Sequence, residues 1–415
     1  MGEIMASSFM RIDPDVPDLG NAPLPVSPYL CQDFFEGERE HIFGQVWLNI
    51  ARGCEIPAPG DFIVRPVEIR NAAVIIVRGQ DGVVRAFHNV CSHRAAKVEW
   101  RQCGNTKLFT CPYHAWSYDT QGQLRGVPSE DNFVNLDKHT NGLTPIACDT
   151  WNDLVFINFA PQPAQPLRQY LGALADYGDD YPMQDFDAWV NVDVGVVNCN
   201  WKIFLDAFQE VYHLNALHRQ TLTDTFKWPD NPHGEPAYFK TFGPHRTISL
   251  GYNPAQRSGP MAELAQRYAT DITSTGGRAL SDARFNLDSH RSGVNPGGID
   301  NWALDVTTIF PNVVWLVGAD SAVFHKIWPI DRSHTRYENY SFYRKPSKAS
   351  ERFGREMSFG LFRDTIVEDI LNTEFNQQAL LSGAKQHFHL QSTEVSVRHH
   401  HHHVARYVRG AGSHA

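Results

Sequence analysis

Two pairs of cysteine and histidine are the residues of this chain best suited to redox chemistry. Cys91 and His93 form a C-x-H motif, and 17 residues later Cys111 and His114 form a C-x-x-H motif. Two thiolates and two imidazoles suit a [2Fe–2S] cluster in which one iron binds the cysteines and the other binds the histidines. Neutral imidazole ligands raise the reduction potential to roughly −150 to +300 mV, against about −400 mV for an all-cysteine plant-type cluster. The motifs therefore predict a protein that handles single electrons.

Zinc is the main alternative occupant for two cysteines and two histidines. Zinc-finger spacing places both cysteines in one motif and both histidines in another. Here each motif holds one cysteine and one histidine, so the order of the ligands favours the iron–sulfur cluster.

A second group of metal-binding residues lies in the stretch 200–218. His213 and His218 are five positions apart, which separates them by about 140° on an ideal helix. A bend or π-bulge after Tyr212 would bring both imidazoles to one metal ion. Non-haem iron oxygenases bind iron through two histidines and one carboxylate and leave positions open for O2. The H-x4-H spacing alone is weak evidence for a metal, so the motif needs a carboxylate to support it.

That carboxylate is expected from residues 348–383, whose periodicity predicts a helix. The acidic candidates there are Asp364, Glu368 and Asp369. Asp369 shares a helical stripe with apolar residues such as Ile366, so it can point inward. We predict Asp369 as the ligand, with Glu368 as the second choice, whereas Asp364 best fits a solvated helix face.

Length and composition set limits on the class of protein. The 415 residues can fold as two domains, and a net charge of −9 without a basic run makes nucleic acid an improbable partner. The five cysteines outside the motifs are scattered, which is typical of reduced thiols in a cytosolic protein. No apolar run has transmembrane length, and no signal peptide is visible at the start of the sequence. We therefore expect a cytoplasmic protein that does not act in a membrane.

The elements that must position these motifs form an α+β fold. Residues 33–49 predict a helix, and residues 45–160 predict a small antiparallel β domain that carries both Cys/His motifs. Residues 1–44 and 161–415 are assigned to a larger domain with an antiparallel sheet flanked by helices. Residues 253–300 are polar and suit either a lid or a surface insertion. The expected strands are 62–67, 73–77, 83–87 and 154–159 in the first domain, and 189–197, 303–309, 312–317, 322–328 and 337–343 in the second.

The sequence around these motifs resembles one known family. Residues 109–128 resemble the second cluster loop and the following hairpin of ring-hydroxylating oxygenases, and residues 200–218 resemble their mononuclear iron site. The chain thus resembles the large (α) subunit of a Rieske non-haem iron oxygenase of the aromatic ring-hydroxylating type. The resemblance implies a Rieske [2Fe–2S] domain over 45–160 and a catalytic mononuclear Fe(II) domain in the rest. Its implied iron ligands are His213, His218 and Asp369.

The resemblance also gives Glu210 a role and marks four departures. In the family the equivalent carboxylate bridges the two metal sites across a subunit boundary, between His213 and His114 of a neighbouring subunit. Residues that depart from the usual family pattern are Ala95 and Ala115, where Gly is commoner, Asp206, where Glu is usual, and Ala207, where Asn is usual.

Partners follow from what the sequence lacks. No G-x-G-x-x-G fingerprint follows a strand, so NAD(P)H must be oxidised by a separate flavin reductase, with or without a ferredoxin. The resemblance implies a homotrimer, with or without a small β subunit. The other reactants are O2 and a small organic substrate, and we expect mono- or dihydroxylation of an aromatic or similar apolar ring compound.

Several alternatives stay open at the level of the sequence. Within the family they are oxidative O- or N-demethylation and oxidation of a quaternary amine; outside it they are a Rieske electron carrier without mononuclear iron and a redox sensor. Five aromatic residues could line a substrate cavity, although core packing is their commoner use: Trp302, Phe310, Trp315, Phe324 and Trp328. The histidine run 399–403 could bind metal adventitiously and is given no catalytic role.

Overall fold

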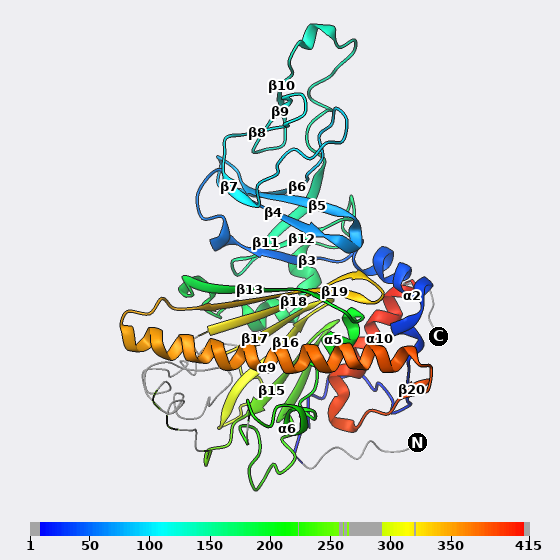
Figure 1. Ribbon diagram of the computed structural model, residues 1–415, viewed down its shortest axis with the longest axis vertical. Coiled ribbons are helices and arrows are strands. Elements are labelled where there is room, and N and C mark those ends of the chain that lie inside the picture. The colour runs from blue at the N-terminus through cyan, green and yellow to red at the C-terminus, as the bar shows by residue number, and fades with distance from the viewer. Residues whose placement is uncertain are drawn as a thin grey trace. The chain divides into compact units, whose positions relative to one another are not determined.

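The computed structural model describes residues 9–222, 224–256, 260, 264, 293–318 and 321–410. The chain divides into two compact units, Arg39–Tyr170 and the combination of Met1–Glu38 with Leu171–Ala415. Most of the predicted lid segment 253–300 lies outside the described residues. Figure 1 labels helices and strands of both units.

The smaller unit is an antiparallel β structure. Its seven-stranded sheet has the order β3-β12-β11-β6-β5-β4-β7, and a three-stranded sheet has the order β10-β9-β8. The bounds are β3 (Leu48–Arg52), β4 (Asp61–Val67), β5 (Ala72–Arg78), β6 (Val84–His88), β7 (Cys103–Asn105), β8 (Leu108–Thr110), β9 (Ser117–Asp119), β10 (Leu124–Gly126), β11 (Pro145–Trp151) and β12 (Leu154–Asn158). The turn between β5 and β6 contains Gly82 at φ 80°, a conformation that favours glycine.

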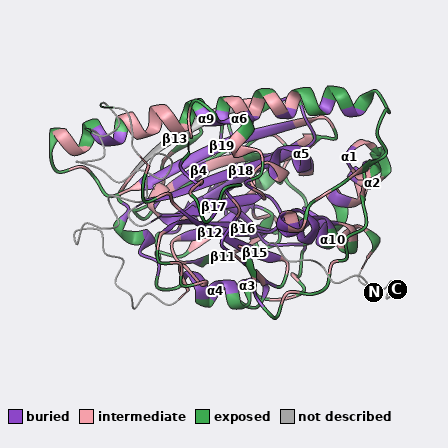
Figure 2. Cartoon of the chain, turned by 90° about the horizontal axis from the view of Figure 1, so that it is seen from below, coloured by how far each residue is buried: buried purple, intermediate pink, exposed green. Residues whose placement is uncertain are grey.

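The larger unit is built on an eight-stranded sheet of order β1-β14-β15-β16-β17-β18-β19-β13, in which only β1 and β14 are parallel. Every residue of β15, β16 and β17 is buried, so this part of the sheet is covered on both faces (Figure 2). The bounds are β1 (Arg11–Ile12), β13 (Ala188–Val197), β14 (Tyr238–Phe242), β15 (His245–Gly251), β16 (Trp302–Ile309), β17 (Val313–Val317), β18 (Ser321–Asp331) and β19 (His334–Tyr343), with β2 (Leu24–Pro25) pairing β20 (His387–Phe388).

The helices of the larger unit are α1 (Ser27–Leu30), α2 (Gln32–Gly37), α4 (Ala173–Gly178), α5 (Trp201–Asp206), α6 (Leu214–Leu217), α9 (Ala349–Leu381) and α10 (Val395–Arg409). At the ends of the smaller unit lie the π-turn Glu38–Ile42 and α3 (Leu167–Leu171). Short 3₁₀ turns cover Gly53–Glu55, Glu68–Arg70, Glu130–Asn132, Met183–Asp185 and Ser392–Glu394. The buried positions of α9 near the sheet recur every three or four residues, from Ile366 through Asp369, Thr373 and Gln377 to Leu380.

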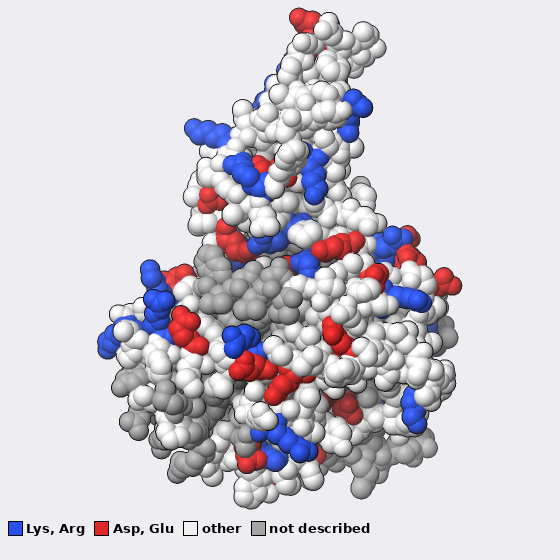
Figure 3. All heavy atoms as spheres, in the orientation of Figure 1, with Lys and Arg blue, Asp and Glu red and all other residues white. Residues whose placement is uncertain are grey.

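The α+β prediction is confirmed, with differences in detail. The predicted helix 33–49 ends at Ile42 because Leu48–Arg52 is completely buried as a strand of the sheet. The sequence analysis missed β14, β15 and α10. Lys and Arg side chains are interspersed with Asp and Glu on the face shown in Figure 3. Within the described residues, no helix combines the length and apolarity needed to span a bilayer.

Candidate metal centres

The two Cys/His loops of the smaller unit have the same backbone design. In each loop the amide four residues after the cysteine donates to the cysteine carbonyl at 2.9 Å, and the cysteine amide donates to the carbonyl five residues further on at 2.8 Å. Ala95 and Ala115 occupy equivalent positions in these turns, with φ of 58° and 59°. These are the positions where glycine is the commoner residue, so the alanines accept a left-handed backbone at a conformational cost.

The loops bring the four predicted cluster ligands together in two pairs. His93 Nδ1 and His114 Nδ1 are 3.0 Å apart, and burial together with the neighbouring Cys91 thiol raises the pKa of the Cys111 thiol. A single tetrahedral ion would require one ligand atom of each of the four residues to lie close to the other three. Among the described residues, these four do not form a set whose ligand atoms all lie within 4.8 Å of one another. A nitrogen pair and a sulfur pair match the two irons of a Rieske cluster.

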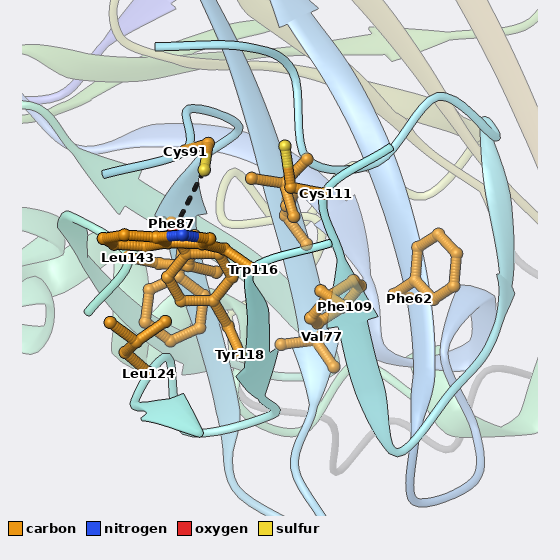
Figure 4. Packing of buried hydrophobic residues seen from close by; sticks show 12 residues of the cluster. Phe62, Val77, Phe87, Cys91, Phe109, Cys111, Trp116, Tyr118, Leu124 and Leu143 are labelled. Carbon is orange, nitrogen blue, oxygen red and sulfur yellow. Dashed lines mark hydrogen bonds between the residues drawn. The ribbon is translucent and has the colours of Figure 1, made fainter. Parts of the chain in front are cut away.

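The cysteines rest on an apolar core (Figure 4). Cys91 and Cys111 are both buried, and the Tyr118 hydroxyl lies 3.2 Å from the Cys91 sulfur and accepts from the Ser92 amide at 3.1 Å. All seven cysteines are free, so no disulfide joins the loops. Burial of the sulfurs and hydrogen bonding to them are among the factors that set the potential of such a cluster.

The larger unit brings His213, His218 and Asp369 to one point, with one ligand atom of each within 4.8 Å of the others. The Nε2 atoms of His213 and His218 lie 3.6 Å and 3.1 Å from Asp369 Oδ1. The opposite ring nitrogens face other carboxylates: His213 Nδ1 is 2.5 Å from Glu210, and His218 Nδ1 is 2.6 Å from Glu368. Each imidazole can thus donate Nδ1–H to a carboxylate and present an Nε2 lone pair to a metal.

Two buried atoms at this point support a cation as the missing partner. Within the described residues, His218 Nε2 and Asp369 Oδ1 have no hydrogen-bond partner, and their mutual contact lacks hydrogen-bond geometry. Burial lowers the pKa of both histidines, but the hydrogen bonds with Glu210 and Glu368 and the nearby negative charge of Asp369 outweigh it and raise the pKa of each above its ordinary value. The negative charge of the carboxylates around the two imidazoles also favours a divalent metal ion. Two histidines and one carboxylate are the donor set of a non-haem Fe(II) centre.

A break in the backbone positions the two histidines. Asn200 caps α5 by accepting from the Lys202 amide at 3.0 Å, and α5 ends at Asp206. The chain then turns until His213, which precedes the single turn of α6, and His218 follows that turn. The sequence analysis expected a bend or π-bulge after Tyr212; the structure has an earlier and longer interruption.

The remaining candidates occupy distinct places. Glu368, the second choice for the carboxylate ligand, accepts from His218 and from Thr221 Oγ1 at 2.9 Å. Asp364 is exposed and pairs with Arg363. The helical stripe favoured Asp369 over the adjacent Glu368, and it is Asp369 that faces the Nε2 atoms of both histidines.

A cavity of about 100 Å³, as formed by the described residues, opens beside the triad. Its walls are mostly apolar, and His213, His218 and Asp369 form one side of it. The five aromatic residues considered earlier lie elsewhere and are all buried in the core. Residues of the wall that the sequence analysis did not single out include Phe208, Phe226, Leu304, Leu316, His325 and Thr365.

Comparison with known proteins agrees with this architecture. Residues 174–410 match the family described as ring hydroxylating alpha subunit (catalytic domain), and residues 46–144 match the Rieske [2Fe-2S] domain. The chain is 32% identical to the glycine betaine monooxygenase oxygenase subunit of Chromohalobacter salexigens over 221 residues, 53% of this chain and 48% of that protein. It is 35% identical to the biphenyl 2,3-dioxygenase subunit alpha of Rhodococcus jostii over 190 residues, 45% of this chain and 41% of that protein.

The matched stretch thus covers less than half of either relative's length. The crystal structure of a quaternary ammonium Rieske monooxygenase in complex with an inhibitor has a TM-score of 0.72 and 20% identity, and the match covers 94% of this chain and 96% of that one. This likeness shows a shared fold.

Proposed function

The chain belongs to the family of ring-hydroxylating oxygenase alpha subunits, and on that premise we propose that it is the terminal oxygenase of a multicomponent Rieske system. It would use O2 and two electrons to hydroxylate an aromatic or similar apolar ring compound. The observation that carries the proposal is the convergence of two imidazoles and one carboxylate on a buried point that opens to an apolar cavity.

Each site residue has a role in this proposal. Cys91, His93, Cys111 and His114 hold the [2Fe–2S] cluster, and His213, His218 and Asp369 hold Fe(II). When bound, these groups supply electron transfer and O2 activation. Glu210 and Glu368 accept Nδ1–H from the two histidines, which fixes the tautomer and the orientation of each ring.

Glu210 also supports a route for electrons between subunits. We propose a head-to-tail homotrimer in which this carboxylate bridges His213 and His114 of the neighbouring subunit. Such heterologous contacts close into a ring. The electrons would come from a cytoplasmic flavin reductase, with or without a ferredoxin, and a small β subunit is compatible with this arrangement.

Oxidation of a quaternary amine is the second candidate function, favoured by the relatives named above that act on glycine betaine and on quaternary ammonium compounds. The cavity favours the first candidate. Its described walls contain no Lys or Arg to neutralise the carboxylate of a betaine, and its own carboxylates, Glu210 and Asp369, face the iron-site histidines. An uncompensated charge buried there would be costly.

Turnover under ¹⁸O2 with a reductase and a panel of aromatic acids, aryl ethers and quaternary amines tests the proposal. We expect one or two labelled oxygen atoms in a ring product. The protein should hold about three irons and two acid-labile sulfides per chain, as one Rieske cluster and one mononuclear site require. Full cluster occupancy with only two irons per chain would indicate an electron carrier instead.

A further inference from the structure

His325, on β18, is a buried histidine in the wall of the iron-site cavity. Its side chain is completely buried, and its ring lies against Phe208 at a centroid distance of 4.3 Å. Nδ1 lies 2.6 Å from the Tyr337 hydroxyl, whereas Nε2 has no hydrogen-bond partner among the described residues. An unpaired polar atom in such a place calls for a partner that the described residues do not supply.

The neighbours on β19 determine which nitrogen of His325 carries the proton. Asn339 Oδ1 accepts from Ser341 Oγ at 3.3 Å, and the amide NH2 group faces His325. That NH2 group lies 3.4 Å from His325 Nδ1. An amide NH2 can only donate.

His325 Nδ1 therefore faces an amide NH2 group that can only donate and the Tyr337 hydroxyl at 2.6 Å, which donates its proton to the ring. Burial raises the pKa of Tyr337 well above its ordinary value, so the hydroxyl keeps this proton. Nδ1 is therefore an acceptor, and a neutral imidazole that accepts at Nδ1 carries its hydrogen on Nε2. Burial lowers the pKa of His325 to about 3, so the ring is neutral at physiological pH.

Building on the proposed function, we propose that His325 Nε2–H is the donor that orients the substrate in the iron-site cavity. The substrate it selects is an uncharged single-ring compound with one hydrogen-bond acceptor, such as a carbonyl or an ether oxygen. A cation would meet the positive end of the N–H bond. An anion would find no Lys or Arg in the described walls.

The size of the cavity agrees with this class. The described residues enclose about 100 Å³, somewhat less than the ~150 Å³ cavity that holds benzene in another protein. This space admits no more than one ring. A directional donor in a mostly apolar space would set which ring edge faces the metal ligands.

The test uses matched pairs of ligands and variants. Dissociation constants of acetophenone and cumene, which have similar shapes but differ in the carbonyl, are measured by calorimetry on the iron-loaded protein without turnover. His325→Phe should weaken acetophenone relative to cumene by about tenfold, the worth of one buried hydrogen bond. His325→Gln, which keeps an N–H near the position of Nε2, should restore the preference.

Two further variants separate this role from a structural one. Thr365→Val alters a wall residue whose hydroxyl already donates to Leu361 O at 3.0 Å, so the ratio should not change. Tyr337→Phe keeps the imidazole but releases Nδ1, so the ratio should shift in the same direction as in His325→Phe. The proposal is overturned if none of the His325 and Tyr337 variants changes the ratio, or if trimethylphenylammonium binds the unmodified protein more tightly than acetophenone. A changed ratio without any ¹⁸O incorporation would instead count against the proposed oxygenase function alone.

Discussion

The histidine run of α10 should make the protein sensitive to mild acid. His399, His400 and His403 are buried, and burial lowers the pKa of His399 to about 2, that of His403 to about 3, and that of His400 well below its ordinary value. The nearby charge of Arg246 acts in the same direction on all three. The neutral form is therefore the one that the folded state requires.

The sign of the effect follows from proton binding. The ordinary pKa of histidine is 6.5. Below this pH, the three histidines bind protons in the unfolded chain but stay unprotonated in the folded chain. The stabilisation is complete above pH 6.5 and is lost as the pH falls towards the folded-state pKa. Each such histidine costs about 1.4 kcal/mol per pH unit in the free energy of unfolding, or about 2 kcal/mol at pH 5. Two of them approach the total stability of a marginal domain, which is about 5–15 kcal/mol.

A matched pair of variants measures this cost. His403→Leu removes a titrating ring from the buried side of α10, whereas His402→Leu makes the same change at the exposed position of the run. Denaturant unfolding followed by far-UV circular dichroism between pH 8 and pH 5 gives the slope of stability against pH. We expect His403→Leu to flatten that slope by about 1.4 kcal/mol per pH unit below pH 6.5, and His402→Leu to leave it as in the parent. Equal slopes in all three proteins would refute the reasoning.

Three other predictions concern the metal sites. Asp369→Asn should remove the mononuclear iron but keep the two cluster irons, whereas the exposed control Asp364→Asn should keep all three; metal analysis decides, and unchanged iron in Asp369→Asn would contradict the assignment. Glu368→Gln should weaken iron binding by about 10- to 100-fold in chelator competition, as loss of an outer-shell partner does, and unaltered affinity would argue against that contact. Ala115→Gly should stabilise the cluster domain by up to about 1 kcal/mol. The steric cost of alanine in the left-handed conformation is removed, and this gain outweighs the larger conformational entropy that glycine loses on folding. Ala96→Gly, which lies outside the positive-φ set, should destabilise it in the same melt of cluster absorbance.

The sequence predicted the features that depend on local pattern. Alternating β-branched residues gave most strands of both sheets, and Asp369 was preferred because its helical stripe is apolar. β14 and β15 were missed, and full burial does not explain the loss of β15, because β16 and β17 are also buried along their whole length and were predicted. α10 was missed because its histidines read as polar, and only the tertiary structure shows that His399, His400 and His403 are buried and neutral.

The same limit applies to the site. The spacing of His213 and His218 argues against a common ligand point on a straight helix, and only the break after Asp206 brings them together. His325 carries no motif at all. Only the pairing of β18 with β19 places Asn339 next to His325.

The departure at Asp206 is accompanied by contacts with residues remote from it in sequence. The Tyr29 hydroxyl donates a 2.6 Å hydrogen bond to the Asp206 carboxylate. His401 Nε2 lies 2.7 Å from the same hydroxyl and 3.1 Å from the carboxylate. The Tyr29 ring also stands 5.6 Å from the buried Lys202 amine, which pairs with Glu38 at 2.7 Å. His401 of the histidine run is thus a partner of Asp206. The unusual residue of α5 and the unusual run of α10 therefore belong to one polar network, in which a change of one member affects the others.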